Sequence, residues 1–306
     1  MSSLAAASRE IPAPRGDAKG ASRRHRRRRL ATFLLLLPGA GFIALAMLAP
    51  LVQLILSSLG LAGLGSDQGF SLAAFGTVLA DPMMRDAFLF SLRIAAMTTL
   101  LSVLSALGLV ALLMLRFPGR RLVMLLYKLP LVVPSLIAAF LVLTMIGPGG
   151  MGARLAAQLG FGWPQLVHDR AGFGVTLVLL WHQIPVTLLI LLAVVGSIPL
   201  DLIDAARNLG ASGPRVFRHV ILPLALPGIS AAALLVFIDC FGAFAVPSLL
   251  GPAYPQALPV MMTYEFLTRA HWQIASAIGV VMTLTTIAVM VLYHRLIARA
   301  DRRPSR

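Results

Sequence analysis

The chain alternates between long apolar runs and short polar segments. The runs cover roughly residues 31–58, 87–115, 122–147, 173–196, 223–249 and 273–294. Each run exceeds the about 20 residues that a helix, rising about 1.5 Å per residue, needs to cross a bilayer core. The pattern therefore predicts an all-α integral membrane protein with six transmembrane helices.

The composition supports a membrane location. Of 306 residues, 58% are hydrophobic and only 12% are charged, whereas soluble domains are about one quarter charged. The single cysteine, Cys240, lies within an apolar run, so the chain cannot build a disulfide framework or a thiolate metal cluster. A net charge of +15 would suit nucleic acid, but the positions of the charges indicate a different role.

Basic residues are concentrated on one side of the predicted bilayer. Of the 26 Lys and Arg residues, 20 fall in the two tails and the loops 116–121 and 197–222, and four fall in the alternate loops. By the positive-inside rule both termini and the loop 197–222 are cytoplasmic. We therefore interpret the run RRHRRRR at residues 23–29 as a topology signal that contacts the lipid bilayer, and no nucleic-acid partner is expected.

The spans divide the chain into five segments. The first run is too long for the core of a cleaved signal sequence, so we expect it to remain as a span. The predicted segments are a basic N-terminal tail that is disordered, a first transmembrane helix, a periplasmic segment, a five-helix core with the cytoplasmic loop 197–222, and a cytoplasmic C-terminal tail. They cover residues 1–30, 31–58, 59–86, 87–295 and 296–306.

The loop 197–222 predicts two short helices around a glycine. The first runs from about Leu200 to Leu209, and its apolar residues Leu202, Ala206 and Leu209 share one face. Gly210 is placed to end this helix in the left-handed conformation. A plain connector between spans could show the same spacing, although about 26 residues is long for one.

The second short helix is expected to start after Ser212, which can cap it, with Pro214 in its first turn. Pro223 marks its junction with the next span. The small residues of the loop leave its backbone open to close approach by another protein.

This loop resembles the cytoplasmic signature of permease subunits of binding-protein-dependent type I ABC importers. That signature runs Glu-Ala-Ala, three residues, Gly, nine residues, an aliphatic residue, any residue, Leu and Pro. Here Asp replaces Glu and Val stands at the aliphatic position. The likeness extends over about residues 86–295. The matching positions are Asp204, Ala205, Ala206, Gly210, Val220, Leu222 and Pro223.

The resemblance implies a MetI-like permease fold in a bacterial inner membrane, working with several partners. These are two ATP-binding cassette ATPase subunits, a second permease that is a paralogue or a copy, and a periplasmic substrate-binding protein. The loop would act as a coupling helix docked on an ATPase. Gly210 would carry the close turn, Asp204 and Arg207 the polar contacts, and Leu209 the apolar contact. The full set of coupling residues is Asp204, Ala205, Ala206, Arg207, Leu209, Gly210, Leu222 and Pro223.

The substrate is less constrained than the family. The motifs GPGG, NLGAS and PSLLGP most resemble the spermidine/putrescine branch, which implies polyamine transport. Permeases for iron(III), sulfate or thiosulfate, thiamine and phosphonate share much of this pattern. Asp239 favours a cation, whereas Arg93, Lys128 and His182 would suit an anion.

Three polar residues within the spans are candidates for the translocation pathway: Asp239, His182 and Gln183. A charge at the bilayer centre costs about 2.5–3.5 kcal/mol on insertion scales, so Asp239 needs a watery cavity, a proton or a partner such as Arg93 or His182. We expect Arg93 and Lys128 to extend to the membrane surface. Pro130 and Pro134 should bend the third span.

The chain lacks the motifs GxxxxGK[ST], HExxH and GxSxG, and shows no metal-ligand spacing. It is therefore not expected to be an enzyme or to bind a cofactor, and ATP hydrolysis would belong to another subunit. An intramembrane enzyme with Asp239 and His182 as acid and base is the alternative of another class. A transporter driven by an ion gradient would not account for the loop signature.

Overall fold

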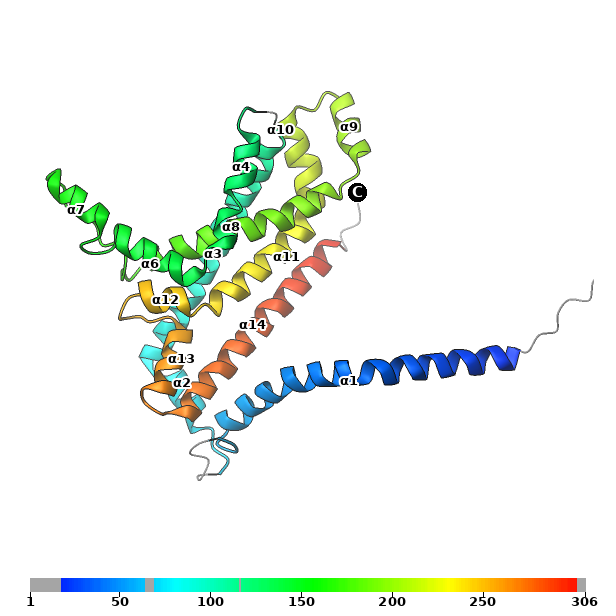
Figure 1. The fold of residues 1–306 in the computed structure, drawn as a ribbon, viewed down its shortest axis with the longest axis horizontal. Helices are drawn as coiled ribbons and strands as arrows, with labels where there is room; N and C mark the ends of the chain where they lie inside the picture. Colours follow the sequence, from blue (N-terminus) through cyan, green and yellow to red (C-terminus); the bar gives the residue numbers. More distant parts are fainter. Residues whose placement is uncertain (1–17, 64–68, 116, 302–306) are drawn as a thin grey trace, which may run out of the picture. The chain divides into compact units, whose positions relative to one another are not determined.

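The structure, a computed structural model, describes residues 18–63, 69–115 and 117–301. Every regular element within these ranges is a helix (Figure 1). In chain order they are α1 (Ala18–Ser58), α2 (Ala73–Ala80), α3 (Pro82–Leu113), α4 (Arg120–Leu126), α5 (Leu129–Val132), α6 (Ser135–Ile146), α7 (Met151–Gln158), α8 (Phe173–Gly196), α9 (Leu200–Asn208), α10 (Gly213–Val216), the π-helical turn η2 (Phe217–Ile221), α11 (Leu222–Phe241), α12 (Ala245–Leu250), α13 (Leu258–Leu267) and α14 (Trp272–Asp301).

Six helical segments of the described residues are long and apolar enough to cross a membrane, which confirms the predicted all-α class and number of spans. They are Leu35–Ser58, Pro82–Leu113, Ser135–Gln158, Phe173–Gly196, Gly213–Phe241 and Trp272–Arg295. Many large apolar side chains are exposed along them, as expected of surfaces that face lipid or another membrane subunit.

The chain divides into two compact units, Met1–Gln53 and Leu54–Arg306. In the first unit α1 begins at Ala18, so the prediction that the whole tail to residue 30 is disordered is wrong from that residue onward. Arginine is a good helix former, and extending an existing helix avoids the cost of nucleation. The remainder of the predicted disordered tail, residues 1–17, lies outside the described residues.

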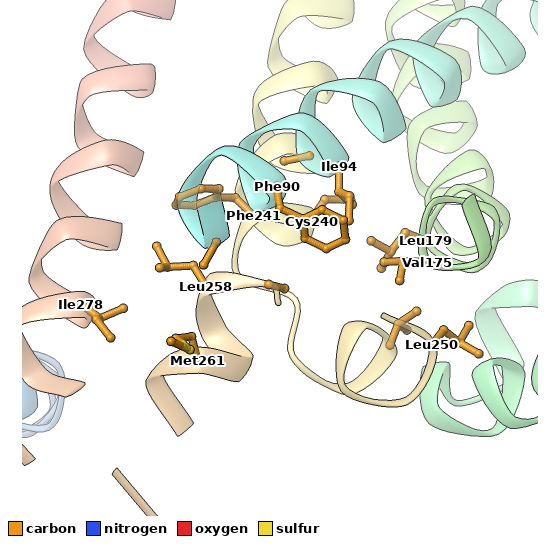
Figure 2. Packing of buried hydrophobic residues seen from close by; sticks show 14 of the residues in the cluster. Phe90, Ile94, Val175, Leu179, Cys240, Phe241, Leu250, Leu258, Met261 and Ile278 are labelled. Atoms are coloured by element: carbon orange, nitrogen blue, oxygen red, sulfur yellow. The ribbon is translucent and has the colours of Figure 1, made fainter. Parts of the chain in front are cut away.

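The second unit is built around α3, α8 and α11, which pack against one another (Figure 1). The helix α13 pairs with α14, α2 packs on α14, and α12 packs on α6. Figure 2 shows how buried side chains from these helices meet, with Phe90 and Ile94 of α3 near Cys240 and Phe241 of α11. A second buried cluster joins the other ends of the three central helices.

The third apolar run, residues 122–147, was predicted to form one bent span, and the structure differs from that prediction. The run forms α4, α5 and α6, with breaks near Lys128 and Pro134, and the segment long enough to cross the membrane starts at Ser135. Val133 is extended, as a residue before proline tends to be, and Pro134 is extended as well. Because Pro134 also lacks an N–H donor, the helix stops and restarts instead of bending.

A buried carboxylate ties α13 to the start of α14. Glu265 is only 1% exposed, and its oxygens accept hydrogen bonds from Arg269 Nη1 at 3.1 Å and His271 Nδ1 at 2.8 Å. The negative charge of Glu265 raises the pKa of the Arg269 guanidinium. The carboxylate is therefore paired within its own hairpin.

A buried hydroxyl pair links α3 to α8. Ser102 and Thr187 are fully buried, and their oxygens lie 2.7 Å apart. The Thr187→Val variant is expected to lose about 1 kcal/mol of stability, because it leaves the Ser102 hydroxyl without this partner. Thermal unfolding in detergent would measure the loss. The double variant Ser102→Ala/Thr187→Val should lose less than the sum of the two single variants, and strictly additive losses would contradict the pairing.

Candidate functional site

The helix α9 ends in a rigid turn at Gly210. Gly210 has φ +83°, which confirms the predicted left-handed conformation. Its N–H donates to the Arg207 carbonyl at 2.9 Å, and the Ala211 N–H donates to the Ala206 carbonyl at 3.0 Å. These two bonds form a Schellman motif, which satisfies the last carbonyls of the helix. A Cβ at Gly210 would meet nothing within 4 Å, so the backbone angle, not crowding, requires glycine.

The packing face of α9 differs from the apolar face expected from its sequence. Ile203 is 8% exposed and packs in a cluster with Ile198, Val216 and Ile221. Of the three residues expected to share a face, Ala206 lies beside this cluster, whereas Leu202 is exposed and Leu209 is 90% exposed. Ile203 therefore anchors α9, and it was missed because we followed the spacing of Leu202, Ala206 and Leu209.

The polar residues of α9 are open to solvent. Asp204 Oδ1 and Arg207 Nη1 lie 3.6 Å apart, and their side chains are 64% and 58% exposed. An exposed pair of this kind contributes little to stability. Ala205 is exposed as well. Beside α9, a hollow of about 430 Å³ is lined by Arg207, Pro214 and Phe217 and by the end of α3.

The second short helix of the loop is not separate. The helix α10 continues through η2 into α11, so Pro223 lies inside a continuous helical segment instead of marking a junction. The Leu222 N–H donates to the Phe217 carbonyl, five residues earlier. This wider π-helical turn gives room for the Pro223 ring, which would clash with a carbonyl in a regular α-helix. Leu222 is half-buried and Pro223 is exposed.

Ser212 stands at the expected N-cap position but does not cap with its side chain. Its backbone is extended, with φ −67° and ψ 158°, and its hydroxyl makes no capping hydrogen bond. Its carbonyl instead accepts from the Val216 N–H at 2.9 Å. The helix therefore starts where expected, but without the expected side-chain hydrogen bond.

Asp239, His182 and Gln183 line one cavity of about 670 Å³. We name it the Asp239 cavity. Its wall is formed by Pro130–Ser135 around the break in the third run, by one face of α8, by the end of α11, and by the turn Gly242–Val246. The three residues that we singled out from the sequence therefore share one hollow between helices.

Asp239 lies at the end of α11, three residues before Gly242, instead of midway along a span. The amide of Gln183 donates to Asp239 Oδ2. Neither expected partner pairs with it, because Arg93 donates to the Arg170 carbonyl at 2.6 Å and His182 bonds the Val133 carbonyl at 2.8 Å. The sequence offered Gln183 only as a neighbour of His182, since its pairing depends on how α8 faces α11.

His182 holds the break in the third run. Its Nε2 must donate, because the Val133 carbonyl can only accept. In the neutral ring, Nδ1 is then an acceptor, and it is buried without a hydrogen-bond partner within the part of the chain that the structure describes. Asp239 and His182 thus have separate partners, the Gln183 amide and the Val133 carbonyl.

The two cations within the spans lie away from the cavity lining. Arg93 is exposed and stands over the Phe90 ring at 5.5 Å. Lys128 is exposed and lies 5.8 Å from the Tyr127 ring centroid. Among the described residues, Asp239 is the charged side chain of the lining.

Comparison with known proteins gives relatives among transport permeases. The thiamine transport system permease protein ThiP of Brucella abortus is 32% identical over 274 residues, which cover 88% of this chain and 48% of that protein. The spermidine/putrescine permease protein PotB of Haemophilus influenzae is 30% identical over 176 residues, 58% of this chain and 62% of PotB. A probable molybdenum ABC transporter permease of Haloferax volcanii is 31% identical over 182 residues, 59% and 63%.

The chain thus spans about half the length of ThiP and less than two thirds of the other two relatives. Among solved structures, a chain of a bacterial alginate ABC transporter matches with a TM-score of 0.78 at 17% identity, covering 91% of this chain and 98% of that one. A chain of the MetNI methionine ABC transporter matches with a TM-score of 0.56 at 20% identity, covering 73% and 100%. At these identities the likeness establishes the fold.

The family assignment follows from the sequence match. Residues 99–306 match the model described as binding-protein-dependent transport system inner membrane component, and the match covers both the loop 197–222 and the Asp239 cavity residues. Because this match extends over more than half of the 306 residues, the chain belongs to the family of inner membrane components of binding-protein-dependent transport systems.

Proposed function

We propose that this chain is the permease subunit of an ATP-driven ABC importer in a bacterial inner membrane, with both termini cytoplasmic. It forms the translocation pathway through the Asp239 cavity and couples to a separate ATPase through the loop 197–222. The observation that carries the proposal is the rigid end of α9. The Schellman turn at Gly210 fixes a helix whose end residue, Leu209, is 90% exposed. A large apolar residue so exposed at a polar loop is a natural contact for another protein.

The residues proposed for the contact have distinct roles. Leu209 enters an apolar site on the ATPase, Asp204 and Arg207 make polar contacts, and Ala205 and Gly210 permit close approach of the backbone. Ala206 and Leu222 are half-buried. They pass the push from α9 into α11 through packing, while Pro223 marks the π-helical turn at the start of α11.

The proposed assembly contains two ATPase subunits, a second permease and a periplasmic substrate-binding protein. The family description names a binding-protein-dependent system. We propose a second permease chain, a copy or a paralogue, because the loop 197–222 resembles that of type I importer permeases, which work in pairs. ATP hydrolysis belongs to the ATPase subunits, and the permease has no catalytic role.

The proposed substrate is a polyamine of the spermidine/putrescine type, supported by the likeness to PotB. Thiamine is the second candidate, supported by ThiP, which matches over more of this chain. The molybdenum relative represents a different class of substrate. Iron(III), sulfate or thiosulfate, and phosphonate remain further alternatives from the sequence pattern.

The coupling role can be tested with the variant Leu209→Asp. Placing a carboxylate in an apolar docking site forfeits the about 1.5–3 kcal/mol of burying leucine and adds a desolvation cost. We expect the amount of ATPase subunit that co-purifies with the tagged permease to fall about tenfold or more, with ATP-driven uptake into proteoliposomes falling in parallel.

Leu200→Asp is the matched control. Leu200 is also exposed, at 72%, and nine positions along a helix place it about half a turn away from Leu209. It should retain the ATPase. If Leu209→Asp co-purifies with as much ATPase as the wild type and transports equally well, the loop does not couple in the proposed way.

A further inference from the structure

The Asp239 cavity is lined by few polar side chains, and the charged one among them is negative. Its polar side chains are Ser135, His182, Gln183 and Asp239, and the rest of the wall is apolar or glycine. No Lys or Arg of the described ranges belongs to the lining. Asp239 is exposed, so its carboxylate is accessible. The volume of about 670 Å³ suits a small solute.

Two N–H groups at this lining already serve protein acceptors. An amide N–H of Gln183 donates to Asp239, and the Nε2–H of His182 donates to the Val133 carbonyl. The remaining atom of the neutral His182 ring, Nδ1, is an acceptor without a partner among the described residues, but it is buried. The wall therefore presents the negative charge of Asp239 to a ligand, and the described residues of the lining include no cationic donor of the kind that binds oxyanions.

We infer that Asp239 is the residue that binds the positive group of the substrate inside this permease, and that the cavity takes a small organic cation. Gln183 occupies the carboxylate while the cavity is empty, and the ligand's positive group replaces the Gln183 amide when it binds. This rests on the proposed function, since it assigns a substrate class to the proposed pathway. It excludes the oxyanion alternatives, sulfate, thiosulfate and phosphonate.

The exchange at Asp239 explains why the partner is an amide instead of an arginine. A neutral donor satisfies part of the carboxylate's hydrogen-bonding capacity but leaves its charge uncompensated. A charged partner would neutralise Asp239 and would have to be displaced against a much larger attraction. A cationic ligand therefore gains an ionic interaction with Asp239 by displacing only a neutral group.

The test measures ATP-driven uptake by the complete transporter, with its binding protein and ATPase, in proteoliposomes. The probes are radiolabelled spermidine, thiamine and sulfate. We expect the wild type to accumulate one of the two cations and not sulfate. For Asp239→Asn we expect the apparent KM for that cation to rise about ten- to a hundredfold, as for loss of a charge-assisted hydrogen bond. Asparagine keeps the size of the side chain and can still accept from Gln183.

Two further variants separate substrate binding from folding. Ser230→Ala is a control on α11 that lies outside the cavity lining and removes no charge, so its uptake should stay within about twofold of the wild type. Gln183→Leu removes the competing amide, so its apparent KM for the cation should equal or fall below that of the wild type. Assembly with the ATPase and ATPase activity stimulated by the binding protein should survive in all three variants, which a general loss of structure would not allow.

Each remaining outcome counts against the inference. Accumulation of sulfate, lack of uptake of both cations, or equal cation uptake by Asp239→Asn and the wild type overturns the cation site. If the wild type neither binds an ATPase nor shows ATP-driven uptake of any probe, the proposed importer function fails as well. An assembled, ATPase-stimulated transporter that carries only sulfate overturns the cation site alone.

Discussion

Replacing Gly210 with proline is expected to abolish ATP-driven uptake while the permease still inserts into the membrane. Gly210 has φ +83° and donates its N–H to the Arg207 carbonyl. Proline fixes φ near about −65° and has no N–H, so it can neither adopt the angle nor make the bond. The end of α9 would unwind and Leu209 would lose its fixed position. Uptake by proteoliposomes, compared at equal amounts of purified permease, measures the loss.

Two variants isolate the cause of that loss. Gly210→Asn should retain more uptake than Gly210→Pro, because asparagine tolerates the left-handed conformation and keeps the N–H. Gly213→Ala should behave as the wild type, since a Cβ there meets nothing within 4 Å and Gly213 has no positive φ. Full uptake by Gly210→Pro would show that the Schellman turn has no part in coupling. Failure of Gly213→Ala would indicate that the loop tolerates no substitution at all.

The success at Gly210 shows which features can be predicted from a single sequence. Helix ends are local: a glycine after an amphipathic turn satisfies the last carbonyls without help from distant residues, so its conformation could be predicted correctly. The number of spans is equally constrained, because the bilayer thickness sets the minimum length of every apolar run. These two constraints account for the correct fold class and for the rigid end of α9.

The features that were predicted incorrectly are not visible in hydropathy, and the pairings among them depend on tertiary contacts. Hydropathy could not show that the third run breaks, because its residues stay apolar through Val133 and Pro134. The partner of Asp239 is Gln183, 56 positions away, and that pairing follows from the facing of α8 and α11. His182 instead forms its hydrogen bond at the break in the third run, with the carbonyl of Val133. The sequence could thus predict which polar residues line the cavity, but not which groups they hydrogen-bond.

The variant Gly228→Leu is expected to destabilise the permease strongly, because Gly228 lies at the contact between α11 and α8. A Cβ at Gly228 would lie 2.4 Å from Val194 Cγ2, and 3.0 Å from Val194 Cβ. The variant gains about 1 kcal/mol of helix propensity. Overpacking costs about 1–3 kcal/mol for a few methylene groups and more for a whole leucine side chain in a close contact, so the steric effect dominates. We expect a strong decrease in the yield of folded permease and a lower unfolding temperature in detergent.

A rescue variant and a control identify the steric origin of this loss. Val194→Ala removes both methyl groups that the new side chain meets first, so Gly228→Leu/Val194→Ala should recover part of the unfolding temperature. Gly108→Leu adds the same side chain near the C-terminal end of α3, where a Cβ meets nothing within 4 Å, and it should not lower that temperature. If Gly228→Leu unfolds at the wild-type temperature, α11 and α8 are not as close as the structure has them. Because Asp239 and Gln183 lie further along these same two helices, the wall of the Asp239 cavity would then need a different arrangement.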